Sequence, residues 1–172
     1  YRWRVVTPDG QPVPLTCGIS LPSSGPLSAA LGADALIVVA GYRLADVATR
    51  PLIRDLRRIA PVFLLVGGID AGPWVLARAG LLDGHKATSN KLFFDRAVSQ
   101  SDKVEWIREA RWVDDGKVIT SSGVSAGMDM ALHLVRRLYG EARAQQIAAG
   151  AEYIWNSDAS NDPFAASKHP VH

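Results

Sequence analysis

The chain has 172 residues, of which 48% are hydrophobic and 21% charged, and its formal net charge at pH 7 is +2. That length and composition are typical of one globular domain with a full core, and so small a charge argues against a surface built for nucleic acid. The single cysteine, Cys17, excludes an internal disulfide framework, and without a long apolar run or a basic-then-apolar leader we expect a cytoplasmic protein.

The first forty residues predict short strands separated by loop. Residues 1–6 are rich in β-formers and end at the turn P-D-G over residues 8–10. Residues 11–26 are rich in Pro, Ser and Gly, and they predict a loop with a brief strand over residues 15–19. Residues 34–40 read D-A-L-I-V-V-A, a continuous apolar and β-branched run that is typical of a buried parallel strand.

A helix is expected next, over residues 49–59. Thr49 and Pro51 supply its start, Pro61 ends it, and apolar residues recur on one of its faces. Three of its arginines form the only compact basic cluster of the sequence: Arg54, Arg57 and Arg58. A solvated helix face explains this cluster better than a phosphate site does.

The most informative stretch runs from residue 62 to residue 84. We expect an apolar strand over residues 62–66, then a glycine-rich turn, and then a helix that opens at Pro73, where the missing N–H costs nothing. Strand, sharp turn and helix together predict a nucleophile elbow, which exposes one side chain at a sheet edge beside a helix N-terminus. The residue on this turn is Asp70.

The second half of the chain alternates short strands and helices. Asp115-Gly116 is a strong hairpin signal, and Gly140 is a helix stop. The expected strands cover residues 86–88, 111–114 and 117–121. The expected helices cover residues 92–99, 103–109, 125–139 and 141–155, and a polar tail follows over residues 156–172.

Strands that alternate with helices predict an α/β domain with a mainly parallel sheet and helices on both faces. In such sheets, ligands bind beyond the carboxyl ends of the strands. The elbow and the turn after residues 117–121 both fall at that edge. We therefore expect any functional site to lie there.

Three stretches resemble the ThiJ/PfpI family, within the class I glutamine amidotransferase-like superfamily. D-A-G-P at residues 70–73 is similar to the C-A-G-P and C-T-G-A elbows of that family. Residues 77–91 and 120–132 resemble its two signatures, the second of which walls the active site. The resemblance implies one ThiJ/PfpI-like domain over residues 1–164 and a tail over residues 165–172.

Two groups within the family are most similar to this sequence. Isonitrile hydratase-like proteins share the wording A-T-S-N-K at residues 87–91 and T-S-S-G-V-S-A-G at residues 120–127. The amidase-like domain of AraC-type transcription regulators resembles residues 1–72. The resemblance implies a flavodoxin-like sheet, paired as a homodimer, whose first strand would lie before Tyr1.

The departures from the family matter as much as the match. Its enzymes carry a cysteine on the elbow, where this chain has Asp70. Their acidic partner lies on or just after the first strand, and many members have a histidine near the position of Asn90. Cys17 lies far upstream in a predicted loop and does not fit the elbow.

Asp70 is poorly equipped for covalent catalysis. A helix N-terminus favours its ionised form, but a carboxylate is a poor substitute for a thiolate, and the ester it forms needs a base for hydrolysis. None of the histidines has the sequence context of a catalytic base: His85, His133, His169 and His172. A carboxylate that caps its helix or accepts turn N–H groups is the better interpretation.

A ligand at the elbow should contact six residues of the turn and the two signatures: Gly68, Ala71, Gly72, Asn90, Thr120 and Ser121. Thr120 and Ser121 could equally well cap the following helix. Trp74 and Trp112 are expected in the core or at a dimer surface. No cluster has metal-ligand spacing, and G-G-I-D-A-G lacks the dinucleotide pattern, so we expect neither a metal nor a cofactor.

Two hypotheses follow. In the first, the chain is a non-catalytic small-molecule-sensing or dimerisation domain related to AraC-type regulators, and Asp70 presents a negative charge to a cationic amine or guanidinium. In the second, it is an isonitrile hydratase-like hydro-lyase or an amidase-like hydrolase that uses Asp70 as base or nucleophile. Residues 156–172 are too few for a helix-turn-helix module, so we expect no nucleic-acid contact by this chain alone and no membrane contact.

Overall fold

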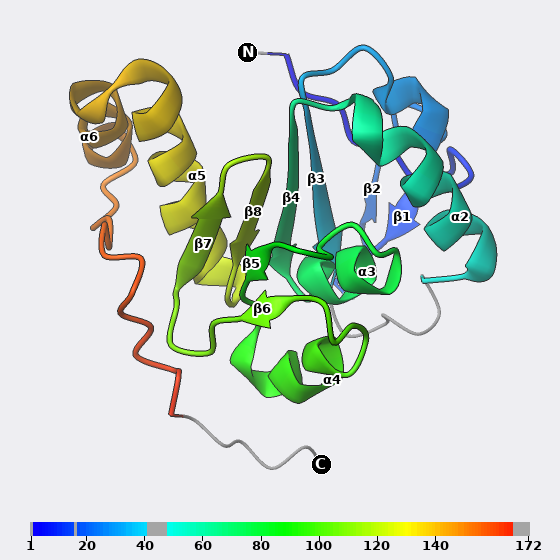
Figure 1. The fold of residues 1–172 in the computed structure, drawn as a ribbon. Coiled ribbons are helices and arrows are strands. Elements are labelled where there is room, and N and C mark those ends of the chain that lie inside the picture. Colours follow the sequence, from blue (N-terminus) through cyan, green and yellow to red (C-terminus); the bar gives the residue numbers. More distant parts are fainter. Residues whose placement is uncertain (1, 16, 41–47, 167–172) are drawn as a thin grey trace.

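A four-stranded sheet forms the centre of the computed structural model, which describes residues 2–15, 17–40 and 48–166 (Figure 1). β3, β4 and β8 are parallel, and β7 pairs antiparallel with β8. The order across the sheet is β3 (Ala35–Ala40), β4 (Leu65–Asp70), β8 (Val118–Ser121) and β7 (Trp112–Asp115). The mainly parallel sheet is therefore confirmed.

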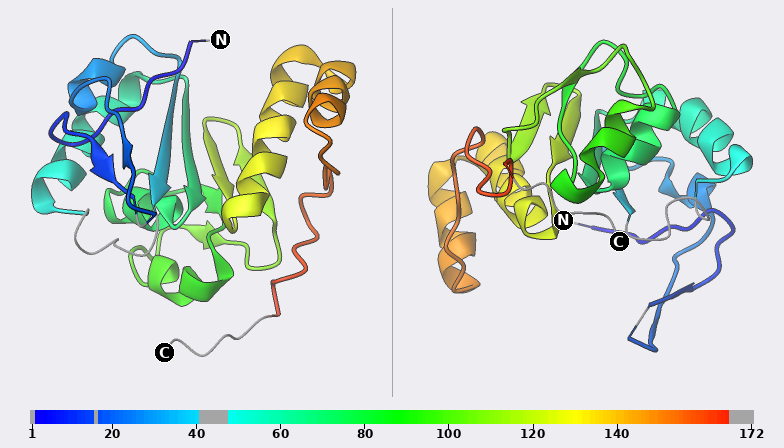
Figure 2. Two further views of the ribbon diagram at one scale, coloured as in Figure 1. Left: turned by 180° about the vertical axis from the view of Figure 1, so that it is seen from behind. Right: turned by 90° about the horizontal axis from the view of Figure 1, so that it is seen from below.

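Helices cover both faces of this sheet, as predicted. The main ones are α2 (Arg50–Ile59), α3 (Gly72–Arg78), α5 (Val124–Tyr139) and α6 (Glu141–Gly150). α2 and α3 lie on one face, whereas α5 lies on the other with α6 outside it (Figures 1 and 2). Val66 of β4 packs in the core under α2 and α3, while its neighbour Leu65 packs with Met130 of α5, because successive strand residues face opposite sides.

The predicted helix after residue 49 is confirmed, together with its start signal. The Thr49 hydroxyl accepts the Leu52 N–H at 3.5 Å, and Pro51 lies in the first turn. Four residues form the buried apolar face of this helix: Leu52, Ile53, Leu56 and Ile59. None of the helices in the described ranges combines the length and apolarity that crossing a bilayer demands.

The strands expected near the N-terminus are wrong. Residues 2–6 form no strand, and only one bridge joins Thr7 to Pro26. Residues 17–19 belong to the turn of a small hairpin rather than to a strand. Prolines at positions 22 and 26 have no N–H to donate, which prevents a longer ladder beside residues 2–6. The elements here are β1 (Val13–Pro14), β2 (Ser20–Leu21) and the short helix η1 (Leu27–Ala30).

The strand expected over residues 62–66 is displaced along the chain. Val62 ends the short helix η2 (Ala60–Val62), and the strand runs instead from Leu65 through both glycines to Asp70. A Cβ on Gly67 would lie 2.6 Å from Ile37 Cδ1, so the glycines serve close packing within the strand rather than a loop. Pairing of six residues with β3 extends β4 to that point.

The helix expected over residues 103–109 is also wrong. The chain there forms the strand β6 (Glu105–Trp106), which pairs parallel with β5 (Lys86–Ala87). Trp106 packs edge-on against Phe94, with ring centroids 5.9 Å apart. Tertiary contacts therefore override the local propensity. The helical prediction just before it is confirmed as η3 (Lys91–Phe93) followed by α4 (Phe94–Val98).

The last helix is shorter than predicted because the chain turns back onto the domain. α6 ends at Gly150, and residues 151–166, here called the C-terminal strap, run along α5 towards the loop before η3 (Figure 1). The Tyr153 hydroxyl and the Trp155 indole N–H both donate to Asp129 of α5. Asp162 is only 5% exposed, so this residue anchors the expected polar tail to the domain, while most of the other described residues of the tail are exposed.

Candidate functional site

Asp70 ends β4 at the carboxyl edge of the parallel strands, where a site is expected. Its backbone lies in the left-handed region with φ +60°, and α3 begins two residues later. Gly72 allows this sharp turn because a Cβ there would lie 2.1 Å from the Val38 carbonyl oxygen of β3. On Gly68, a Cβ would lie 2.8 Å from the Pro73 nitrogen. Both glycines thus let α3 pack closely on the sheet.

Asp70 is 7% exposed, and its side chain is held by neutral donors. The Asn90 amide donates to Asp70 Oδ2 at 2.7 Å, and the Ala71 backbone N–H also donates to the carboxylate. Burial raises the pKa of the Asp70 carboxyl above its ordinary value, and these two hydrogen bonds oppose the rise. Within the described ranges, no cationic side chain pairs with it.

Residues 88–90 form the wall of the site and are locked onto β4 and β8. The Ser89 hydroxyl and the Asn90 N–H both donate to the Asp70 carbonyl oxygen, at 3.1 and 3.0 Å. The Thr88 N–H donates to Thr120 Oγ1 at 2.9 Å. Asn90 Oδ1 accepts the Leu92 N–H, so the rotamer that presents its amide to Asp70 is held from both ends.

The structure brings only part of the predicted ligand set into contact. Ala71 and Asn90 each donate to Asp70, whereas Thr120 is fully buried and its hydroxyl oxygen accepts the Thr88 N–H. Ser121 is fully buried too, and its hydroxyl has no hydrogen-bond partner in the described part of the chain. Neither Thr120 nor Ser121 supplies a side-chain cap for α5, whose N-cap residue is Gly123.

A buried ionic network beside the site was missed from the sequence. Lys91 Nζ lies 3.3 Å from Asp162 Oδ2, and Arg111 Nε lies 2.6 Å from Asp129 Oδ2. These side chains are at most 8% exposed. Burial lowers the pKa of Lys91 below its ordinary value, and the negative charge of Asp162 offsets only part of this decrease. Two of the four residues, Lys91 and Asp129, fall within the motifs quoted above, and charged residues inside such motifs were the available signal.

The described histidines lie away from Asp70. His85 Nδ1 is 2.8 Å from Asp115 Oδ2, and His133 Nε2 is 2.7 Å from Asp114 Oδ2. Asp115 pairs with residue 118, which aligns with residue 66, four positions before Asp70. The carboxylate that pairs with His85 therefore lies about 13 Å from Asp70 along the strand direction. His169 and His172 lie outside the described residues.

Trp74 and Trp112, which could have lined a site, lie in the core. Trp74 and Trp112 are 8% and 1% exposed, which confirms their place in the core. Arg78 stacks over Trp74, 5.2 Å from the ring centroid. Among the residues that the structure describes, no group of three or more His, Cys, Asp or Glu side chains is arranged to hold a metal ion.

A comparison with protein families now identifies the chain. The profile of the DJ-1/PfpI family matches residues 1–137. The chain belongs to this family. HTH-type transcriptional regulator CdhR of Pseudomonas aeruginosa is 37% identical over 148 residues, which are 86% of this DJ-1/PfpI chain and 44% of the regulator. Isonitrile hydratase of Pseudomonas putida is 34% identical over 93 residues, 51% of this chain and 37% of that enzyme.

Solved structures show the same DJ-1/PfpI flavodoxin-like fold. An AraC family transcriptional regulator from Pseudomonas putida superposes with a TM-score of 0.76 at 25% identity, covering 87% of this chain and 80% of that one. DJ-1beta of Drosophila melanogaster gives 0.74 at 22% identity, covering 88% and 83%. The chain spans less than half the length of the curated regulators that it matches.

Proposed function

We propose that this chain is the small-molecule-sensing domain of an AraC-type transcription regulator and that it binds a cationic amine or guanidinium at Asp70. Regulators named as HTH-type match it over 86% of its length, which supports the regulatory role. Such a domain works in the cytoplasm, and we expect it to act as a homodimer. Sedimentation equilibrium of the 172-residue chain tests the dimer, and a monomer at micromolar concentration would contradict it.

The observation that carries the ligand class is the charge balance at Asp70. A buried carboxylate is costly unless a cation or several donors compensate it. Asp70 receives one amide and one backbone N–H, both neutral. A bound ammonium or guanidinium would supply the missing positive charge and lower the pKa of Asp70 again.

A non-catalytic role fits the same geometry. We take Asp70 to stand where the family's enzymes carry cysteine, because it follows the same strand and precedes the same G-P step. Both described histidines are paired with carboxylates at the opposite end of the strands. An ester formed on Asp70 would therefore lack an imidazole base for its hydrolysis.

Calorimetry with butylguanidine tests the proposal. This ligand stays charged from pH 5 to pH 8, and butylurea is its neutral analogue of nearly the same shape. We expect heat of binding for butylguanidine only, an affinity that falls as Asp70 takes up a proton at lower pH, and loss of binding in Asp70→Asn. Equal binding of the two ligands, or full binding by Asp70→Asn, would overturn the proposal.

A second function is favoured by one observation. Isonitrile hydratase matches half of the chain, and a carboxyl with a raised pKa is suited to general acid–base work on an added water. Asp70 would then protonate the terminal carbon of an alkyl isonitrile while water adds to the same carbon, the added water would return a proton to the Asp70 carboxylate, and the resulting formimidic acid would tautomerise to the N-alkylformamide. Formamide production by wild type that Asp70→Asn lacks would favour this function, and equal rates would exclude it.

A further inference from the structure

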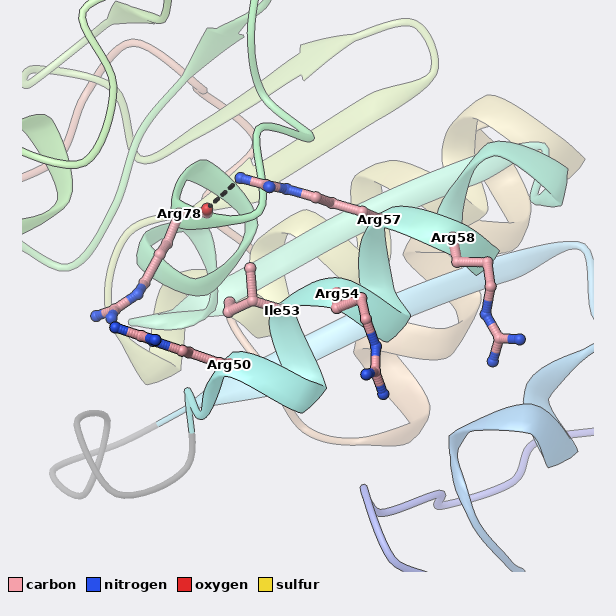
Figure 3. A pocket seen from close by; sticks show the side chains of 6 residues that line it. All are labelled: Arg50, Ile53, Arg54, Arg57, Arg58 and Arg78. Atoms are coloured by element: carbon pink, nitrogen blue, oxygen red, sulfur yellow. Dashed lines mark hydrogen bonds between the residues drawn. The ribbon is translucent and has the colours of Figure 1, made fainter.

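A second charged site, which does not include Asp70, lies on the outer side of α2. An open hollow of about 580 Å³ lies there between α2 and α3 (Figure 3). Its lining is almost entirely cationic: Arg50, Arg54, Arg57 and Arg58 of α2, Arg78 of α3, and the single apolar residue Ile53. We call this set the arginine groove.

The arginine groove carries more positive charge than its surroundings neutralise. Among the described residues, Asp55 is the carboxylate that pairs with its arginines, 3.2 Å from Arg54 and 3.9 Å from Arg58, while Asp83 and Asp102 line an adjoining hollow that Arg57 and Arg78 share. Arg57 donates to the carbonyl oxygens of Ala79 and Arg78 at the end of α3. Arg50 has no carboxylate partner within the described part of the chain. Five arginines therefore line the groove, and one carboxylate of the described residues is ion-paired with them.

Two of these arginines converge although they come from different helices. The guanidinium groups of Arg50 and Arg78 point toward one another at one end of the groove (Figure 3). Arg78 is supported from below by the Trp74 ring. Like charges that point toward one another repel each other, and an anion between them would relieve that repulsion. Arginine pairs of this kind suit phosphate oxygens, which accept bidentate hydrogen bonds.

The shape of the groove selects an extended anion over a small enclosed one. Small-molecule sites are mostly apolar and bury their ligand, whereas Arg54 and Arg58 keep side-chain exposures of 75% and 74%. The α2 arginines span nine residues of helix, a rise of about 12 Å. A DNA duplex carries one phosphate charge per about 1.7 Å of its axis, so it can face every arginine of such a row.

We propose that the arginine groove binds the phosphate backbone of duplex DNA as an auxiliary contact without sequence preference. The choice of DNA among polyanions rests on the proposed regulatory function, because a regulator's partner domain brings DNA close. The small net charge of the chain limits the contact to an auxiliary one. Sequence alone predicts a solvated face here, since Arg50 and Arg78 join the cluster only in the fold.

Fluorescence anisotropy of a labelled random-sequence 24-bp duplex, titrated with the 172-residue chain between 50 and 200 mM salt, tests this proposal. Arg50→Gln/Arg78→Gln should bind about 5–10-fold more weakly at 50 mM salt, and the slope of log K against log salt should fall by about 2. The matched control is Arg96→Gln/Arg143→Gln, which removes the same charge from exposed positions elsewhere and should change affinity less than about 2-fold. If the double variant is unstable, the single variant Arg50→Gln replaces it, and the slope of log K against log salt should then fall by about 1.

Three results would overturn the proposal. One is the absence of binding by wild type at 50 mM salt, and another is an equal loss in both double variants, which would indicate general charge attraction. The third is competition by a poly-glutamate peptide as strong as that by unlabelled duplex, which would indicate an acidic protein partner instead. Asp70→Asn should bind DNA like wild type, so a failed ligand test at the elbow leaves this measurement readable.

Discussion

Two buried aspartates of this domain solve the same electrostatic problem in different ways. Asp129 is completely buried, and it faces Arg111 at 2.6 Å while also accepting the Tyr153 hydroxyl and the Asn156 N–H. Asp70 is nearly as buried, but its carboxylate receives only the Asn90 amide and one backbone N–H. One carboxylate is compensated by the fold, and the other is not.

This difference separates a structural charge from a functional one. The Arg111–Asp129 pair joins the β7 strand region to α5 and the C-terminal strap, so its charges hold the domain together. Asp70 is paired with no cation of the described residues and accepts from two neutral donors. An under-compensated carboxylate costs stability, and such costs persist at sites that serve binding. Three substitutions would break or sharpen this comparison.

Arg111→Met should have the largest effect. It leaves Asp129 buried without a cation, so we expect a loss of about 3–5 kcal/mol in the free energy of unfolding at pH 7. Urea denaturation followed by circular dichroism measures it. Exposed Arg143→Met is the control and should change stability by less than about 0.5 kcal/mol. A loss of under about 1 kcal/mol at Arg111 would show that Asp129 does not depend on this cation.

Asn90→Ala should have an intermediate effect. It removes the amide that donates to Asp70 Oδ2 at 2.7 Å, and hydrogen bonds to charged groups contribute about 1.5–3 kcal/mol. The pKa of Asp70 should rise further, because the amide lowers it in wild type. Asn90→Ala introduced into the Asp70→Asn variant should lower the free energy of unfolding by clearly less than it does in wild type. Equal costs in the two backgrounds would mean that Asn90 acts through the Leu92 cap alone.

Asp70→Asn should have the smallest effect, and its sign is opposite. The amide avoids burial of a charge, so we expect a gain of about 2–4 °C in Tm at pH 7 without ligand. Because the folded pKa of Asp70 is raised, wild type loses stability relative to the variant as pH rises from about 3.8 through that folded pKa. The gain should therefore be smaller at pH 4 than at pH 7. A variant less stable than wild type at pH 7 would mean that Asp70 is already fully compensated.

Local sequence signals were sufficient for much of the fold. The apolar run at residues 34–40, the Thr49 cap and the Asp115-Gly116 hairpin all act over a few residues, and each predicted element is present. Position 70 was also singled out from the strand–turn–helix pattern alone. Where neighbours in space decide, the predictions were wrong: residues 103–109 form β6 because β5 lies alongside them.

The sequence by itself determined the alternation of strands and helices, the edge of the sheet that carries Asp70, and the resemblance to a family now shown. Only the tertiary structure decided which charges are compensated: Arg111 meets Asp129, Lys91 meets Asp162, and Arg50 converges with Arg78. Electrostatic energy depends on distance through space and on burial, and neither quantity is written in the order of residues along a chain.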